Sequence, residues 1–291
     1  MTKPQSFWAG FKQQRAALLG GCWIVLLSFV ALAGPVLRPD PTPHANDQNL
    51  SWALLPPGAE VDDPAGVGHK IFVLGTDRFG RDFLSRLMAG SGISLGVGAM
   101  AVLISLLIGV PLGAYAGYRG GWPDAIIRWV IQVVWTLPTM LMVLAIALAF
   151  GKGLVQIFIA IGLTMWVDVA RVVRGVVLSL KEEPYIEAAR ALGLRSPSIL
   201  TRHILPGAIG PILVLSASNF ATAILVEAGL SFLGVGAQMP APSWGNIVQA
   251  HCHLITGDHA HLALAPGLLI VSVVLAFTFL GDGLRAVLDA N

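Results

Sequence analysis

Residues 87–118 read LMAGSGISLGVGAMAVLISLLIGVPLGAYAGY, a run of 32 residues without a charged side chain, bounded by Arg86 and Arg119. A helix needs about 20 predominantly apolar residues to cross a bilayer, so this run predicts a transmembrane span. The whole chain has the same character: 55% of its residues are hydrophobic, 12% are charged and the mean hydropathy is +0.76. Because an ordinary soluble domain is about 25% charged, we expect an all-α polytopic membrane protein and not a soluble enzyme.

Further apolar runs predict additional spans. We expect six in total: residues 16–37, 87–118 and 129–151, a fourth that begins at Gly153, a fifth over about 207–235 and a sixth over about 262–281. The fourth contains Asp168, Arg171 and Arg174, so its inner end should be polar and face protein or headgroups. The first run includes Ala31-Leu32-Ala33, which resembles a signal-peptidase site. Its apolar character continues to Leu37, and we expect it to remain as an anchor.

The distribution of basic residues sets the expected orientation. With the N-terminus in the cytoplasm, 12 of the 18 Lys and Arg residues fall on the cytoplasmic side, which favours cytoplasmic positions for both termini. The other six lie outside, five of them in a first outer loop that is long enough for the rule to apply less strictly. The expected parts are a cytoplasmic N-terminus with the first helix (1–37), an outer loop (38–86), a five-helix core (87–285) that includes a cytoplasmic loop (181–206), and a cytoplasmic C-terminus (286–291).

The sequence argues against several functions. The net charge of +2 and the scattered basic residues do not suit a nucleic-acid partner. The two cysteines, Cys22 and Cys252, lie in segments that should be far apart, so they imply no disulfide framework. Gly151-Lys152 does not complete a phosphate-binding loop, because Ile146 and Gly153 stand where the loop needs glycine and Ser or Thr. We therefore expect no catalysis and no cofactor in this chain; energy must come from another chain or an ion gradient.

The cytoplasmic loop contains residues typical of the starts and ends of two short helices. It spans 181–206 and reads KEEPYIEAARALGLRSPSILTRHILP. Pro184 suits the first turn of a helix, and Gly193 suits the position just after its end, where a left-handed backbone is needed. The pair Ser196-Pro197 then predicts an N-cap and first residue of a second helix, which Pro206 should end or kink. Two short helices should therefore protrude on the cytoplasmic side.

This loop resembles a known family. Glu187-Ala188-Ala189, then Gly193, then Leu205-Pro206 are similar to the EAA loop of permease subunits in binding-protein-dependent ABC importers, which implies the permease fold of that family. It also implies that the loop docks in a cleft of a separate ATPase subunit and transmits its movement. The chain has His203 where the family pattern has Ile. The alternative to docking is a passive connector.

Two further segments resemble the second permease of peptide and nickel importers within this family. They are LGTDRFGRD (residues 74–82), before the second span, and EAGLSFLG (227–234), at the outer end of the fifth. Together with GYRGG (117–121) in the first inner loop, the resemblance covers roughly residues 70–285. Residues 58–73 look longer than is usual in the family, a departure that would alter the docking of a binding protein.

The outer segment has both a functional and a structural interpretation. The resemblance implies that this segment contacts a binding protein or a partner permease through Asp77, Arg78, Arg81 and Asp82. The structural alternative is an interfacial helix, since the spacing i,i+4 relates Asp77 to Arg81, Arg78 to Asp82 and Asp82 to Arg86. Each such pair would contribute about 0.3–0.5 kcal/mol.

The resemblance implies an assembly and a class of substrate. The chain would be one of two homologous permease subunits in the cell inner membrane, in contact with membrane lipid, two ATP-binding cassette subunits or domains and an extracytoplasmic substrate-binding protein. The implied substrates are di- and oligopeptides, with nickel as the alternative. The rival from another class is a proton-coupled secondary transporter, with a relay formed by Glu227, Asp168, Arg171 and Arg174. No pair of broken helices in matching halves of the sequence supports that rival.

Glu227 is the one acidic residue well inside an apolar run. An ionised carboxylate in a span costs several kcal/mol unless it is paired or hydrated, so a proton-coupled site is one interpretation. Because Glu227 lies near the outer end of its span, we favour the other interpretation, a hydrogen-bonded residue that holds the fifth span against its neighbours.

One outer loop is rich in potential metal ligands. It contains His251, Cys252, His253, Asp258, His259 and His261. Imidazole, thiolate and carboxylate groups could bind zinc or nickel. We favour a solvated or headgroup-facing polar surface and expect no metal site.

The orientation is testable by chemical labelling. In a Cys-free background, single cysteines at Ser51 and Gln249 should react with a membrane-impermeant maleimide in intact cells, and a cysteine at Ser198 should not, because the first two positions are expected outside and the third inside. Labelling of Ser198→Cys in intact cells would overturn the topology.

Overall fold

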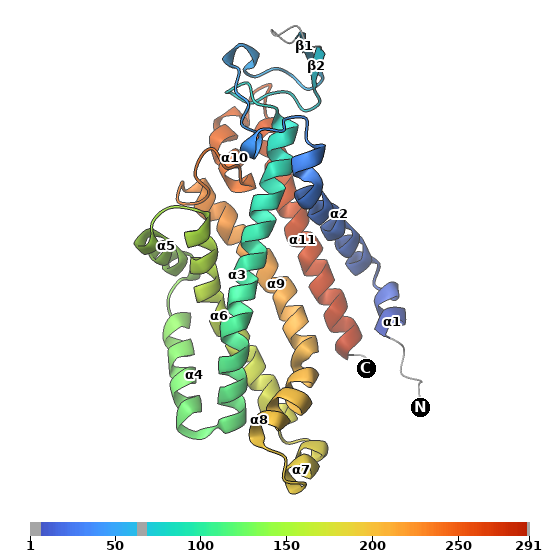
Figure 1. Cartoon of the computed structure of the whole chain (residues 1–291), viewed down its shortest axis with the longest axis vertical. Helices are drawn as coiled ribbons and strands as arrows, with labels where there is room; N and C mark the ends of the chain where they lie inside the picture. Colours follow the sequence, from blue (N-terminus) through green and yellow to red (C-terminus); the bar gives the residue numbers. More distant parts are fainter. Residues whose placement is uncertain (1–6, 63–68, 290–291) are drawn as a thin grey trace.

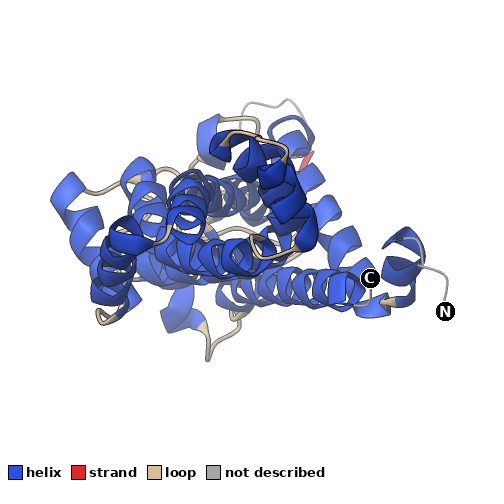
Figure 2. Cartoon of the chain, turned by 90° about the horizontal axis from the view of Figure 1, so that it is seen from below, coloured by secondary structure: helices blue, strands red, loops and turns tan. Residues whose placement is uncertain are grey.

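The computed structural model of the protein describes residues 7–62 and 69–289, and nearly all of its regular structure is helical (Figure 1, Figure 2). The α-helices are α1 (Phe7–Gln13), α2 (Arg15–Leu37), α3 (Phe83–Arg119), α4 (Gly121–Trp135), α5 (Thr139–Phe150), α6 (Leu154–Leu180), α7 (Pro184–Ala191), α8 (Ser196–Ile199), α9 (Leu205–Phe232), α10 (Trp244–His251) and α11 (His261–Asp289). The remaining elements are the short helical turns η1 (Pro43–Ala45), η2 (Leu50–Trp52), η3 (Leu200–Ile204) and η4 (Cys252–Leu254) and the strands β1 (Ala59–Asp62) and β2 (His69–Phe72).

The polytopic helical fold is confirmed. Among the described residues, five helical segments are long and apolar enough to cross a membrane: α2, α3, α6, the continuous segment Ser196–Phe232 and α11. The pair α4 and α5 is bent by 94° at a short break and supplies a sixth candidate. The predicted third span, 129–151, is therefore wrong as a single helix. Pro138 explains the break, because proline cannot donate the next helical hydrogen bond and disfavours the helical conformation at Leu137.

Several helices extend beyond the apolar runs that predicted them. Helix α6 continues to Leu180, so Asp168 lies near the midpoint of the helix. Helix α11 continues to Asp289, well past the predicted end at residue 281. Charged residues end an apolar run in the sequence, but they do not end a helix, since Asp and Arg are tolerated in helices that leave the bilayer or face protein.

Helices α3 and α6 lie side by side (Figure 1), and where glycines of α3 face α6 the two backbones are too close to admit a side chain. A Cβ atom at Gly113 would clash with the Ala170 carbonyl oxygen. One turn to either side, a Cβ at Gly109 or Gly117 would lie 2.7 or 2.8 Å from a carbonyl oxygen of α6. Small residues four apart are the usual means by which membrane helices bring their backbones together. These three glycines thus form a stripe on α3 against which α6 packs closely.

The two ends of the helical bundle differ in structure. Figure 1 shows α7 at one end and the hairpin of β1 and β2 at the other. The strands pair antiparallel from Ala59 opposite Phe72 to Asp62 opposite His69. The stretch 58–73, which looks long in the sequence, contains this hairpin. The proline-rich chain before it forms only the short turns η1 and η2, as expected for a segment that is neither a regular helix nor a central strand.

The glycine stripe can be tested with a matched pair of substitutions on α3. Gly113→Ala should destabilise the protein by about 1–3 kcal/mol, because the added methyl group meets the α6 backbone. Gly96→Ala should be neutral or stabilising by up to about 1 kcal/mol, since no described atom lies within 4 Å of its added Cβ. Thermal unfolding of the purified protein in detergent measures both. Equal stability of the two variants would contradict the close contact.

Candidate functional site

Helix α7 begins and ends where the sequence predicts. Glu183 is its N-cap residue and Pro184 lies in its first turn. At the other end the Leu194 N–H donates to the Ala189 carbonyl at 3.2 Å and the Gly193 N–H donates to the Arg190 carbonyl at 2.9 Å. This pair of bonds is the Schellman motif, which needs a left-handed residue at the turn. Gly193 has φ +77°, as predicted.

The second short helix differs from the prediction in two respects. Helix α8 has Arg195, not Ser196, at its N-cap, and within the described chain no side chain caps it. It is also not separate, because it continues through the π-helical turn η3 into α9. Pro206 lies in the first turn of α9 and does not end the helix. Proline lacks the N–H that an α-helix needs at this point, and a wider π turn before it accommodates the missing bond.

Helix α7 has a buried face and an exposed face. Ile186 and Ala189 are buried against the end of α6 and the start of the α8–α9 segment. Glu187, Ala188 and Gly193 are exposed. Ala189 is only 6% exposed, so it packs against the protein and cannot contact a partner surface.

The exposed face of α7 carries apolar side chains. Leu192 is 81% exposed and Tyr185 is 48% exposed. Of the other two residues singled out in the loop, Leu205 packs beside the buried cluster and Pro206 is exposed. Exposed apolar side chains at the protruding tip of a protein commonly mark a contact surface for another protein.

The outer segment 74–82 forms a turn and not the alternative interfacial helix. Thr76 pairs with Asp82 in an isolated β-bridge that closes the turn. Gly75 and Gly80 both have positive φ, which suits a tight turn and not a helix. The helix alternative is therefore wrong.

Buried polar contacts hold this turn. The Arg81 guanidinium lies 2.6 Å from the Asp77 carboxylate, and both side chains are buried. Asp82 accepts a bond from the Ser85 N–H at 2.9 Å and so caps α3, while Arg86 lies 3.9 Å from Asp77. Of the four residues expected to contact a partner, Asp77, Arg81 and Asp82 are buried and only Arg78 is exposed. The three buried residues shape the segment from within.

Glu227 is fully buried at the junction of three helices. The Ser94 hydroxyl of α3 donates to one carboxylate oxygen at 3.1 Å, and the Ser231 hydroxyl of α9 donates to the other at 2.7 Å. The backbone N–H of Trp244, in α10, donates to the Ser94 hydroxyl oxygen at 3.2 Å. Seryl hydroxyls thus bind both oxygens, an arrangement that suits a residue holding α9 against α3 and α10.

The side chains of the histidine-rich loop differ in exposure, whereas those of a solvated polar surface would all be exposed. His251 is buried, with its Nδ1 atom 2.8 Å from the Ile247 carbonyl oxygen, and burial lowers the pKa of its imidazole. His251 and His261 both lie edge-on to the Phe83 ring. Cys252 and His253 are exposed. In the described ranges, no three His, Cys, Asp or Glu side chains are grouped closely enough to hold a metal ion.

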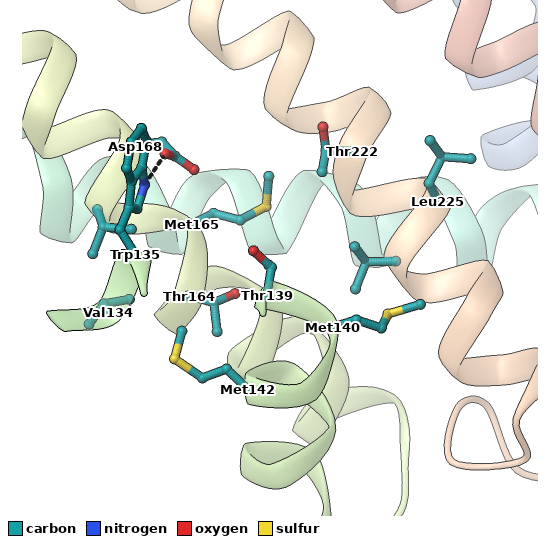
Figure 3. Close-up of a pocket in the computed structure, with 12 residues that line it drawn as sticks. Val134, Trp135, Thr139, Met140, Met142, Thr164, Met165, Asp168, Thr222 and Leu225 are labelled. Carbon is teal, nitrogen blue, oxygen red and sulfur yellow. Dashed lines mark hydrogen bonds between the residues drawn. The ribbon is translucent and has the colours of Figure 1, made fainter. Parts of the chain in front are cut away.

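A cavity of about 530 Å³ lies at the break between α4 and α5 (Figure 3). Its lining comes from α4, α5, α6 and α9: Val134, Trp135, Thr139, Met140, Met142, Thr164, Met165, Val167, Asp168, Thr222, Leu225 and Val226. The Trp135 indole N–H donates to the Asp168 carboxylate at 2.8 Å. The Arg171 guanidinium lies 4.0 Å from the centroid of the same indole ring. Sequence reasoning noted Asp168 and Arg171 but missed the cavity, since only tertiary packing brings these helices together.

The charged residues of α6 and Glu227 have separate partners. The Arg174 guanidinium lies 2.8 Å from the Asp124 carboxylate and links α6 to α4. Asp168 is bound by Trp135, whereas Glu227 is bound by serines. The residues of the alternative proton relay thus lie in three different local environments. These residues are Glu227, Asp168, Arg171 and Arg174.

The sequence is similar to known transport proteins. Residues 109–291 match the family described as binding-protein-dependent transport system inner membrane component, and residues 4–57 match the N-terminal TM domain of oligopeptide transport permease C. The chain is 36% identical to the glutathione transport system permease protein GsiD of Pectobacterium atrosepticum, over 98% of this chain and 90% of that protein. It is also 36% identical to the dipeptide transport system permease protein DppC of Bacillus subtilis, over 98% and 85% respectively.

The fold is also similar to that of solved structures. A chain of the inward-facing MetNI methionine ABC transporter matches with a TM-score of 0.56, at 20% identity, over 70% of this chain and 96% of that chain. At this identity the likeness shows the fold alone.

The role of Glu227 can be tested by two substitutions. Glu227→Ala should lower the free energy of unfolding by about 1–3 kcal/mol, because it leaves the buried Ser94 and Ser231 hydroxyls without their acceptor. Glu227→Gln keeps an oxygen acceptor at the site and should cost less. Thermal unfolding in detergent gives the stabilities. If Glu227 instead belongs to a proton relay, Glu227→Gln should fold normally and abolish solute uptake. That outcome would contradict the structural role.

Proposed function

The chain belongs to the binding-protein-dependent transport system inner membrane components, and we propose that it is one of two permease subunits of an ATP-driven importer of short peptides. It is a multi-pass membrane protein of the ABC importer permease family. The observation that carries the proposal is α7, a short helix that is held firmly on one face and presents an exposed apolar face beyond the spans.

The proposed role of α7 is to dock a separate ATPase subunit. Ile186 and Ala189 anchor the helix to the protein, so a push on its exposed face acts on the helices beneath it. Leu192 and Tyr185 offer the partner an apolar contact, flanked by Ala188 and Glu187. The hydrolysis of ATP belongs in this proposal to that partner.

The orientation and partners follow from the same proposal. The end with α7 (residues 181–206) faces the cytoplasm, and the end with the hairpin (38–86) faces outward across the cell inner membrane. A substrate-binding protein would approach the hairpin end, where Arg78 is exposed. A second, homologous permease would complete the path.

Peptides are the proposed substrates because of the relatives. Relatives that are 36% identical over nearly the whole chain are named for the transport of glutathione and of dipeptides. Both names denote short peptides. The similarity extends over 98% of this chain, so it includes the helices that would line the path as well as the docking loop.

Substitutions at Gly193 and Ala188 test the docking role. Gly193→Val should reduce the stimulation of ATPase activity by loaded binding protein by about tenfold or more, because a β-branched residue is strained by over 1 kcal/mol at φ +77° and displaces α7. Ala188→Trp, on the exposed face, should have the same effect by blocking the partner. Both should insert in the membrane normally. The measurement is ATPase stimulation in reconstituted complexes, together with pull-down of the ATPase.

Matched controls separate docking from general damage. Gly193→Asn should remain close to wild type, because asparagine tolerates the left-handed conformation better than valine. Ala188→Ser keeps the residue small and should also remain close to wild type. If Gly193→Val and Ala188→Trp retain wild-type stimulation and pull-down, α7 is not the docking element.

A further inference from the structure

The cavity between α4, α5, α6 and α9 is lined by one charged residue, Asp168, and a second, Arg171, lies over the ring of the lining residue Trp135. Arg171 is exposed, Asp168 is partly exposed, and Trp135, which touches both, is 54% exposed. These two charged residues are three positions apart on α6 and therefore lie on the same side of the helix. The opposite side of α6 is seated on the glycine stripe of α3.

The depth of these groups restricts what they can face. Asp168 lies 14 residues after the first residue of α6 and 12 before its last, which places it about 21 Å and about 18 Å from the two helix ends. A hydrocarbon core is about 30 Å thick, so a bilayer centred on α6 would contain this position. Charged side chains at such depth face protein or water and not lipid. An exposed Arg171 at this depth therefore faces water or another protein chain.

The groups at the cavity suit a ligand that carries both an ammonium group and a carboxylate and whose side chains vary. Trp135 binds one oxygen of Asp168 through its indole N–H, and the carboxylate has further lone pairs for an ammonium group. The Arg171 guanidinium stacks on the indole face, and such a group presents its N–H donors at its edge. A negative group thus lies at the edge of the indole ring and a positive group lies over its face.

The rest of the lining is soft and weakly polar. Three flexible thioether side chains, which adapt to different apolar shapes, come from Met140, Met142 and Met165. Three hydroxyl groups come from Thr139, Thr164 and Thr222 (Figure 3). Those of Thr164 and Thr222 donate to carbonyl oxygens of their own helices and can still accept a bond from a peptide N–H. The volume, about 530 Å³, is in the range of small-molecule sites.

We propose that this cavity is a peptide-contacting site in the translocation path, where Asp168 binds the peptide's free ammonium group, Arg171 binds its carboxylate and the methionines receive its side chains. Trp135 is a positioning residue that holds both charged groups. The site rests on the proposed function, since its ligand is the proposed transported solute. It is distinct from the docking of α7 and from the binding protein, and it would act after the peptide has left that protein.

The test uses the complete complex of this chain with its partner permease, ATPase and binding protein in proteoliposomes. The probe is the dipeptide Ala-Phe, and the readout is peptide taken up per ATP hydrolysed. Asp168→Asn and Arg171→Gln should each lower that ratio by about tenfold, the range for loss of one charge-assisted hydrogen bond. Asp168→Glu should restore most of it. Lys152→Gln, which removes an exposed charge from the loop between α5 and α6, is the matched control and should have no effect.

A second measurement does not depend on any variant. The analogue alanyl-p-benzoylphenylalanine carries a photoreactive ketone that attacks methionine readily, so illumination of the wild-type complex during turnover should label Met142 or Met165. Labelling only at a methionine outside the cavity, such as Met88, would overturn the site. So would unchanged uptake per ATP in both charge variants.

Two further outcomes would show whether the site alone fails or the proposed peptide function fails too. Loss of co-purification with the partner permease in Arg171→Gln would overturn the site by making Arg171 a contact between subunits. If the wild-type complex hydrolyses ATP in response to its binding protein but takes up neither dipeptide, the proposed peptide function fails and this site fails with it.

Discussion

Helices α3 and α6 pack backbone against backbone, because Gly109, Gly113 and Gly117 place no side chain between them. This contact fixes the rotation of α6 about its own axis. With the stripe side of α6 turned to α3, Asp168 lines the cavity and Arg171 lies over the ring of Trp135, which also lines it. Arg174, one turn further on, pairs with Asp124 and so sets the position of α4. The place of the cavity and the start of α7 both follow from how α6 is seated.

The structure suggests how movement at one end would reach the other under the proposed function. Helix α7 is anchored to the end of α6 and to the first turns of the α8–α9 segment. These two long helices supply much of the cavity lining, including Thr164 from α6 and Thr222 from α9. Further along α9, Glu227 is bound to Ser94 of α3, which holds that end of the helix in place. A displacement of α7 would therefore act on the cavity through α6, while α9 stays fixed near Glu227.

Hydropathy and local turn chemistry predicted much of this fold. Long uncharged runs are enough to predict membrane helices, because the bilayer excludes unpaired charge. Pro184 and Gly193 predicted both ends of α7, since each residue restricts or permits a particular backbone conformation. The break in the third span also had a local signal in Pro138, which a count of uncharged residues passes over.

Other features depend on contacts that a single sequence does not reveal. The spacing of Asp77 and Arg81 fits a helix as well as a turn, and Gly75 and Gly80 were local signals of the turn. The burial of Ala189 depends on the α8–α9 segment folding back beneath it. The central claim, that the exposed face of α7 meets an ATPase, is tested most directly by a photoreactive amino acid at Leu192 in the assembled complex. The account predicts cross-links from that position to the ATPase subunit, and none to it from a matched exposed position, Ile255, at the hairpin end. Cross-links from Leu192 to the binding protein, or to lipid alone, would contradict it.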